Sequence, residues 1–178
     1  MKATEQLKEE HRAIKMMLRI LEAISKRVKK GGPIPKARLE NVMEFVKVFV
    51  DKCHHGKEEE LLFPAMEEAG VSREGSPIAV MLAEHDMGRG YVKAMSEAVS
   101  SGDSKKFVEN AEKYIQLLEQ HIDKEDNILY MIADIRLPKD RQDELIEEFD
   151  EMEKERMGIG THEELHKLLH QLQREFLE

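Results

Sequence analysis

The sequence contains too little cysteine for a disulfide framework or for a cysteine-rich metal site. Cys53 is the single cysteine, so no internal disulfide can form. Tryptophan is absent, and aromatic residues make up only 5% of the chain, so the side chains that favour β-strands are scarce. Glycine and proline are also few, whereas Leu, Met, Glu and Lys are abundant. This composition predicts an all-α protein.

Long apolar runs are missing as well. No stretch approaches the roughly 20 apolar residues of a membrane-spanning helix, and the start, MKATEQLKEEHR, lacks the apolar core of a signal peptide. A formal charge of −9, with 37% of residues charged, argues against nucleic acid as the main partner. We therefore expect a cytoplasmic protein with neither a nucleic-acid nor a membrane partner. The sequence identifies no protein partner.

The few Gly and Pro residues mark the expected ends of six helices in one domain. Ser76 with Pro77 is a plausible helix start, and Thr161 with Glu164 predicts a capping box. Pro64 falls inside the second helix and predicts a kink or an early end there. The helices are expected over about 4–30, 35–68, 77–100 and 104–134, then from Pro138 to near the MGIG sequence, and finally from Thr161 onwards.

The first four helices carry apolar residues in alternating steps of three and four. This spacing predicts an antiparallel up-down four-helix bundle over residues 1–135. Residues 136–178 are expected to form two additional C-terminal helices packed on the bundle, so that the chain is a single domain overall. Each apolar stripe is interrupted by polar residues where leucine would be expected. These are His11, His54, Glu58, His85, His121 and Glu125.

Four of these residues belong to an internal repeat. The stretch CHHGKEEELLFPAM, residues 53–66, is matched later by QHIDKEDNILYMIA, residues 120–133. Each copy places a histidine and a glutamate four residues apart, which puts both side chains on one helix face. The matched pairs are His54 with His121, Lys57 with Lys124, Glu58 with Glu125, Leu62 with Leu129, and Phe63 with Tyr130.

Six polar residues in one core need compensation. An unpaired buried polar group costs on the order of 2–7 kcal/mol, against a total stability of only about 5–15 kcal/mol. A surface His–Glu pair explains a single occurrence but not a repeated one on the apolar stripe. A buried hydrogen-bond network without metal is the remaining alternative. Four histidines and two glutamates favour two divalent metals, with both glutamates bridging; iron, zinc and manganese all accept such ligands.

At these residues the chain resembles the hemerythrin-like, or HHE cation-binding, family. The resemblance covers roughly residues 5 to 135, and HHGKEEELLFP, AEHD and HIDKEDNILY are its most specific pieces. It implies a four-helix bundle with a non-haem centre of two iron ions, joined by an oxo or hydroxo bridge. Carried over by position, the implied metal ligands are His11, His54, Glu58, His85, His121 and Glu125. His55 with Glu59 has the same spacing, but His54 with Glu58 aligns with the second copy.

One departure from the family pattern bears on function. Oxygen-carrying hemerythrins have a His-x-x-x-His pair on the third helix, whereas Met81 and Arg89 flank His85 here. This difference puts reversible oxygen carriage in doubt. We expect a metal-binding protein that binds or senses dioxygen, nitric oxide or peroxide. The alternatives are a di-iron enzyme or iron donor in oxidative or nitrosative stress defence, acting in iron-centre repair or in peroxide or nitric oxide reduction, and a structural or storage metal site.

Three histidines remain outside this pattern. His162, His166 and His170 are spaced four apart along one edge of the last expected helix. The simplest interpretation is an amphipathic helix that packs on the bundle with a partly wet histidine edge. The alternatives are that His162 or His166 supplies the missing metal ligand or a gate, or that the three hold another metal.

Overall fold

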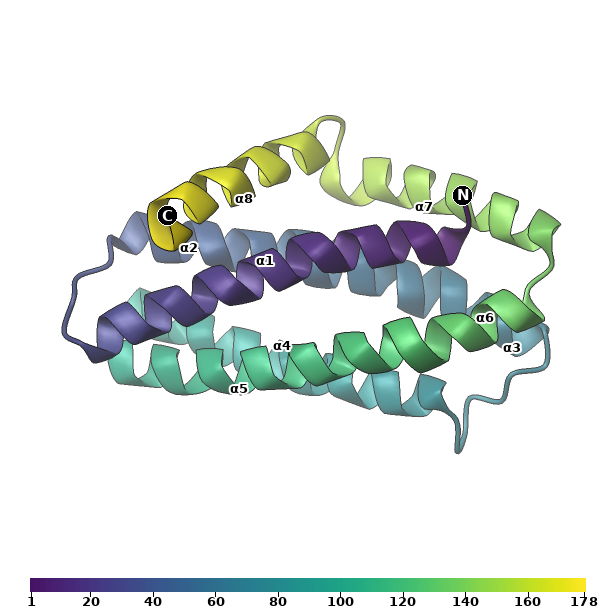
Figure 1. Ribbon diagram of the computed structural model, residues 1–178, viewed down its shortest axis with the longest axis horizontal. Coiled ribbons are helices and arrows are strands. Elements are labelled where there is room, and N and C mark those ends of the chain that lie inside the picture. Colours follow the sequence, from purple (N-terminus) through teal and green to yellow (C-terminus); the bar gives the residue numbers. More distant parts are fainter.

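The computed structural model describes all 178 residues as helices joined by short loops, without any β-strand. The all-α prediction is therefore confirmed. Four long helical segments run along the long axis of the molecule (Figure 1). They are α1 (Ala3–Lys29), then α2 (Lys36–Phe45) with η1 (Val46–His55), η2 (Glu58–Leu62) and α3 (Phe63–Glu68), then α4 (Pro77–Ser101), and finally α5 (Ser104–Lys124) with η3 (Glu125–Leu129) and α6 (Tyr130–Arg136).

The second and fourth segments contain π-helical turns, which the sequence did not predict. These turns are η1, η2 and η3, and the sequence repeat places η2 and η3 at matching positions. A π-turn bonds residue i to i+5, so its turn is wider than that of an α-helix. Pro64 lies in the first turn of α3, directly after η2, so the expected interruption takes the form of a change from π to α bonding.

The two caps predicted from the sequence have opposite outcomes. The Ser76 hydroxyl accepts a hydrogen bond of 3.2 Å from the Ile78 amide at the start of α4, as the sequence predicts. The capping box expected at Thr161 is wrong. Gly160, with a φ of 84°, precedes the last helix, and no side chain caps it. The left-handed backbone at Gly160 ends the preceding loop instead.

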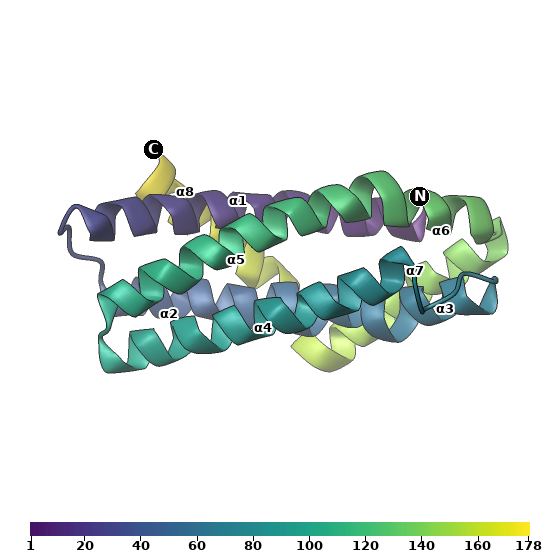
Figure 2. The ribbon, with the colours of Figure 1, turned by 90° about the horizontal axis from the view of Figure 1, so that it is seen from below.

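Two further helices lie along one side of the molecule. They are α7 (Lys139–Met157) and α8 (Thr161–Leu177), and they cover α1 and the α2–η1 segment (Figures 1 and 2). Leu145 and Phe149 of α7, and Leu165 and Leu169 of α8, are buried. None of the helices combines the length and the apolar character that a membrane crossing requires.

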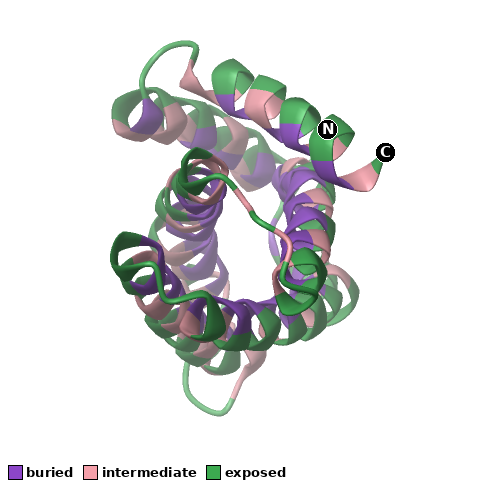
Figure 3. Ribbon diagram, turned by 90° about the vertical axis from the view of Figure 1, so that its left-hand side faces the viewer, coloured by how far each residue is buried: buried purple, intermediate pink, exposed green.

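The interior is divided into two apolar clusters. α1 packs against α5, α5 against α4, and α4 against α2 and η1, so that the buried faces point inward (Figure 3). One cluster contains 30 buried residues and the other 14. Between them lies a group of buried side chains that we call the polar layer: His11, His54, His55, Glu58, His85, His121 and Glu125.

Candidate metal centre

The polar layer consists of two adjoining groups of metal-binding side chains. In each group, one nitrogen or oxygen atom per residue lies within 4.8 Å of the corresponding atoms of the others. All six residues predicted from the sequence are present, and His55 joins them. The first group is His11, His54 and Glu125, and the second is His55, Glu58, His85 and His121.

Each glutamate lies between imidazoles of both groups. Glu125 Oε1 is 3.1 Å from His11 Nε2 and 3.2 Å from His121 Nε2. Glu58 Oε1 is 3.3 Å from His85 Nε2 and 3.6 Å from His54 Nε2. Both carboxylates therefore lie between the two groups of side chains, each within 3.6 Å of an imidazole nitrogen from either group.

Three atoms of the polar layer are buried without a hydrogen-bond partner. They are His54 Nε2, Glu58 Oε1 and Glu125 Oε2. Buried polar atoms are almost always paired, because leaving one unpaired costs about 1–3 kcal/mol. Imidazole nitrogen and carboxylate oxygen are also atoms that bind divalent metals directly. The donor set and its orphaned atoms therefore fit cations.

An outer ring of carboxylates orients the imidazoles. In all five histidines Nδ1 lies beside a carboxylate oxygen, an arrangement that fixes the ring and directs Nε2 towards a metal. The polar layer is thus supported from outside by a second set of residues. The contacts are His11–Asp126 at 2.7 Å, His54–Glu10 at 2.8 Å, His55–Asp51 at 3.2 Å, His85–Glu59 at 2.7 Å and His121–Glu84 at 2.9 Å.

Four of these outer carboxylates repeat the symmetry of the chain. Glu10 and Glu84 each precede a histidine of the polar layer, while Glu59 and Asp126 each follow a glutamate of it. Lysines of the repeat complete the pattern. Lys57 Nζ donates to Glu10 Oε2 at 2.6 Å, and Lys124 donates to Glu84. The repeat had paired the two lysines without a role, and sequence reasoning missed the carboxylates, although their fixed positions beside predicted ligands offered a signal.

His55 has no counterpart in the second half, where the aligned residue is the buried Ile122. From the sequence, the pair of His55 with Glu59 was an alternative to the pair of His54 with Glu58. In the structure, His54 and His55 both face the polar layer. Because η1 is wound as a π-helix, successive side chains are separated by a smaller angle than in an α-helix. Glu59 instead points outward to His85 Nδ1. His55 stacks on His85 with 3.8 Å between ring centroids.

Tyr130 marks a second difference between the halves. Its buried hydroxyl donates to Glu58 Oε2 at 2.9 Å and lies 3.3 Å from His11 Nε2. The aligned residue is Phe63, which has no hydroxyl group to offer to Glu125. Glu58 therefore has a protein donor on Oε2, whereas Glu125 Oε2 has none.

Burial and mutual proximity perturb the acids and bases of the layer. Burial and the charge of Glu58 raise the pKa of Glu125 well above its ordinary value. Burial also disfavours ionised Glu58, yet contacts with Glu125, His54 and His85 lower its pKa well below the ordinary value. The two carboxyls therefore titrate as a pair. For His85, burial opposes the charge, but Glu58 and Glu59 raise the pKa to about 9.

The C-terminal histidines lie outside both groups. His162 Nε2 is 2.9 Å from His166 Nε2, and His162 Nδ1 is 3.1 Å from Glu153 Oε1, at ion-pair distance but not aligned for a hydrogen bond. His170 is exposed. Neither His162 nor His166 belongs to either group, whereas His55 belongs to the second.

A helical bundle with a buried layer of imidazoles and carboxylates defines a metal-binding class of protein. The chain belongs to the hemerythrin HHE cation-binding domain family, whose model matches residues 2–133. It is 25% identical over 163 residues to uncharacterized proteins of Mycobacterium bovis (Mb2018) and Mycobacterium tuberculosis (Rv1995), a match that covers 88% of this chain. The matched region covers 63% of the length of those relatives. No solved structure matches the chain.

Proposed function

We propose that the polar layer holds two iron ions and that the protein binds or senses a small ligand such as dioxygen, nitric oxide or peroxide. The two carboxylates carry this proposal, because each lies between imidazoles of both groups. A single ion rarely uses seven such side chains. In this proposal the four long segments form the antiparallel up-down bundle expected from the sequence.

The side chains of the polar layer would be divided between the two ions. His11 and His54 would hold one ion, while His55, His85 and His121 would hold the other, with Glu58 and Glu125 shared. Iron in such a centre supplies an exchangeable coordination position and one-electron redox chemistry. The outer carboxylates keep each imidazole oriented, with Nδ1 protonated and Nε2 free as a ligand.

The unequal supply of imidazoles suggests where a small ligand binds. The first group has two histidines and the second has three. The less crowded side also carries the Tyr130 hydroxyl, 3.3 Å from His11 Nε2. A buried O–H at this point can donate a hydrogen bond to a small bound anion or to the distal atom of a diatomic molecule. We assign ligand binding to the His11–His54 side.

Elemental analysis and an optical spectrum of protein purified from its own host test the centre. We expect two irons per chain and, after exposure of the reduced protein to oxygen, visible charge-transfer bands. A variant with Glu58→Gln and Glu125→Gln should lose paired metal binding. The matched control is Glu119→Gln with Glu163→Gln, two exposed glutamates without ion pairs. Two metals retained by the first variant would defeat the bridging assignment.

The same samples separate the proposal from its alternatives. A colourless protein loaded with zinc would point to a structural or storage site. Turnover of peroxide or nitric oxide well above that of free iron would favour an enzyme, whereas stoichiometric binding would favour a sensor. His55→Ala should weaken metal binding in the second group, so that at limiting metal about one ion per chain is retained. His170→Ala, at an exposed site on α8, serves as its control.

A further inference from the structure

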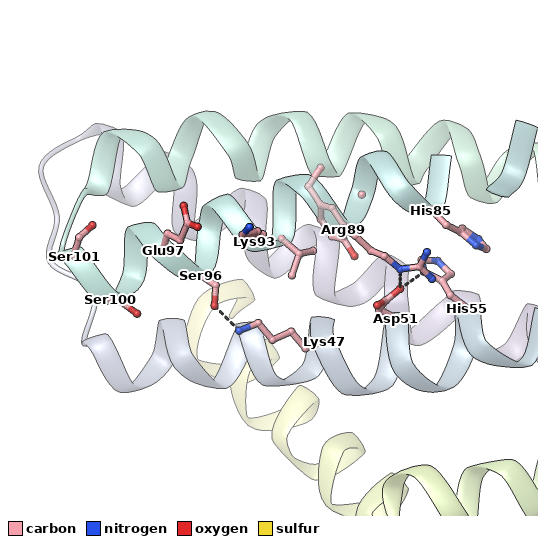
Figure 4. A pocket seen from close by; sticks show the side chains of 13 residues that line it. Lys47, Asp51, His55, His85, Arg89, Lys93, Ser96, Glu97, Ser100 and Ser101 are labelled. Atoms are coloured by element: carbon pink, nitrogen blue, oxygen red, sulfur yellow. Dashed lines mark hydrogen bonds and ion pairs between the residues drawn. The ribbon is translucent and has the colours of Figure 1, made fainter. Parts of the chain in front are cut away.

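A polar groove leads away from the second group of the polar layer. It has a volume of about 820 Å³ and lies between α4 and the α2–η1 segment (Figure 4). His55 and His85 line one end, and Ser100 and Ser101 line the other. The volume far exceeds that of a diatomic molecule and falls in the range of sites for small organic ligands.

The charges along the groove are unevenly compensated. Its two acidic residues are already paired, because Asp51 accepts from Arg89 at 2.9 Å and Glu97 accepts from Lys106 at 3.0 Å. The lysines that line it, Lys47 and Lys93, form no ion pair within 4.0 Å, and only the more distant charge of Lys93 acts, after Lys106, to lower the pKa of Glu97. Lys47 donates only to the Ser96 hydroxyl, as Figure 4 shows. In a chain with a net charge of −9, this groove therefore presents two unpaired cations.

A buried tyrosine adds a second, independent observation. Tyr114 of α5 lines the groove and is only 3% exposed, yet its hydroxyl has no hydrogen-bond partner in the protein. The hydroxyl oxygen itself is not among the fully buried unpaired atoms, so it reaches the open space of the groove, where a bound molecule can accept its hydrogen bond. Burial raises the pKa of Tyr114, so that the hydroxyl remains protonated and able to donate. An occupant of the groove would give this group its missing partner.

We propose that the groove binds a small organic anion that carries a phosphate or a carboxylate group. The acidic group pairs with Lys47 and Lys93, while the polar body reaches the Tyr114 hydroxyl and ends beside His55 and His85. Lys93 follows His85 by two helical turns on α4, about 12 Å along the axis. This distance suits an extended molecule rather than a single inorganic ion.

The role of this anion as a second ligand beside the metals rests on the proposed function, but its binding does not. Lys47, Lys93 and Tyr114 belong to neither group of metal-binding side chains, so the anion should also bind the metal-free protein. Failure of metal binding would therefore leave the groove proposal standing, and failure of anion binding would leave the metal centre standing.

Calorimetry with glycerol 3-phosphate, succinate and uncharged glycerol tests the proposal on metal-free and metal-loaded full-length protein. We expect at least one anion to bind, more weakly at high salt, and glycerol not to bind. The two anions distinguish a phosphate from a carboxylate ligand. Lys47→Gln with Lys93→Gln should weaken binding by about tenfold or more, because two charge-assisted contacts are lost. The control is Lys113→Gln with Lys167→Gln, two exposed lysines outside the groove.

Tyr114→Phe provides a variant that should fold normally. It removes only a hydroxyl without a protein partner, so affinity for the anion should fall several-fold while thermal stability is maintained. The proposal is overturned if neither anion binds at millimolar concentration. It is equally overturned if the double lysine variant binds as tightly as the wild type.

Discussion

Removal of the Tyr130 hydroxyl should lower the unfolding free energy of the metal-free protein. It donates to Glu58 Oε2 at 2.9 Å in a fully buried environment. Tyr130→Phe leaves that carboxylate oxygen without its donor, which should cost about 1–3 kcal/mol of unfolding free energy. Urea denaturation of the metal-free variant measures this loss.

Tyr114→Phe is the matched control, since both tyrosines are buried and both substitutions remove one oxygen atom. The Tyr114 hydroxyl has no protein partner, so its removal should leave the midpoint unchanged or slightly raised. Equal losses in the two variants would show that the contact between Tyr130 and Glu58 is not the cause.

At the same scale, the apolar stripes predicted six members of the polar layer. The internal repeat accounts for four of them, because His54 with Glu58 and His121 with Glu125 follow one pattern. His55 escaped prediction because a repeat cannot indicate a residue whose counterpart is Ile122. Its inward position depends on the π-helical winding of η1. No local sequence motif indicates that winding. The role of Tyr114 was equally hidden, since a missing hydrogen-bond partner is a property of the folded chain.

At the scale of elements, glycine, proline and capping residues located the helices to within a few residues. For α8 the sequence predicted the start of the helix correctly but the cap wrongly. Thr161 was predicted as a cap, yet α8 starts after Gly160 without a side-chain cap. The position of α8 is set by buried Leu165 and Leu169 and by its packing against α1, a tertiary contact that no local capping signal encodes.

An ion pair between Glu153 of α7 and His162 of α8 should stabilise the fold over a limited pH range. Burial opposes the charge of Glu153, but His162 and Lys57 lower its pKa from 4.5 to about 2, so its contribution to stability is lost as pH falls below about 4.5. The contact with Glu153 raises the pKa of His162 above 6.5, so its contribution is lost as pH rises through that raised value. The pair is therefore most stabilising between about pH 4.5 and 6.5.

His162→Gln should lower the melting temperature mainly within this range. A partly exposed pair contributes roughly 0.5–1 kcal/mol, which corresponds to about 1–4 °C for a chain of this size. The curves of variant and wild type should converge at alkaline pH, where His162 is neutral in both states. Glu163→Gln, an exposed change on the same helix, should shift nothing. A constant difference at every pH would exclude the ion pair as its origin.

For the whole molecule, the polar layer separates two apolar clusters, and we expect it to make stability depend on metal. Lys57, which is fully buried against α7, shows how far the fold encloses charge, whereas its repeat counterpart Lys124 remains 37% exposed. Without metal, the layer holds charged and unpaired groups at a cost that the clusters must offset. Metal binding should therefore raise the melting temperature, by an amount that grows with the ratio of free metal to its dissociation constant.

The size of that increase should depend on pH with a definite sign. His85 has a pKa raised from 6.5 to about 9, so its proton stabilises the metal-free fold fully below pH 6.5 and progressively less as pH rises through 9. A ligand histidine must lose this proton, and Glu125 must lose the proton that its raised pKa retains. Metal uptake near neutral pH should therefore release protons, detectable with an indicator dye in weak buffer. The metal-induced rise in melting temperature should grow between pH 6 and pH 9, because alkaline conditions weaken the metal-free fold and favour the deprotonated ligands.

Zinc added to the Glu58→Gln and Glu125→Gln variant should release fewer protons. A release that is the same in that variant and in the wild type would place the titrating groups outside the polar layer.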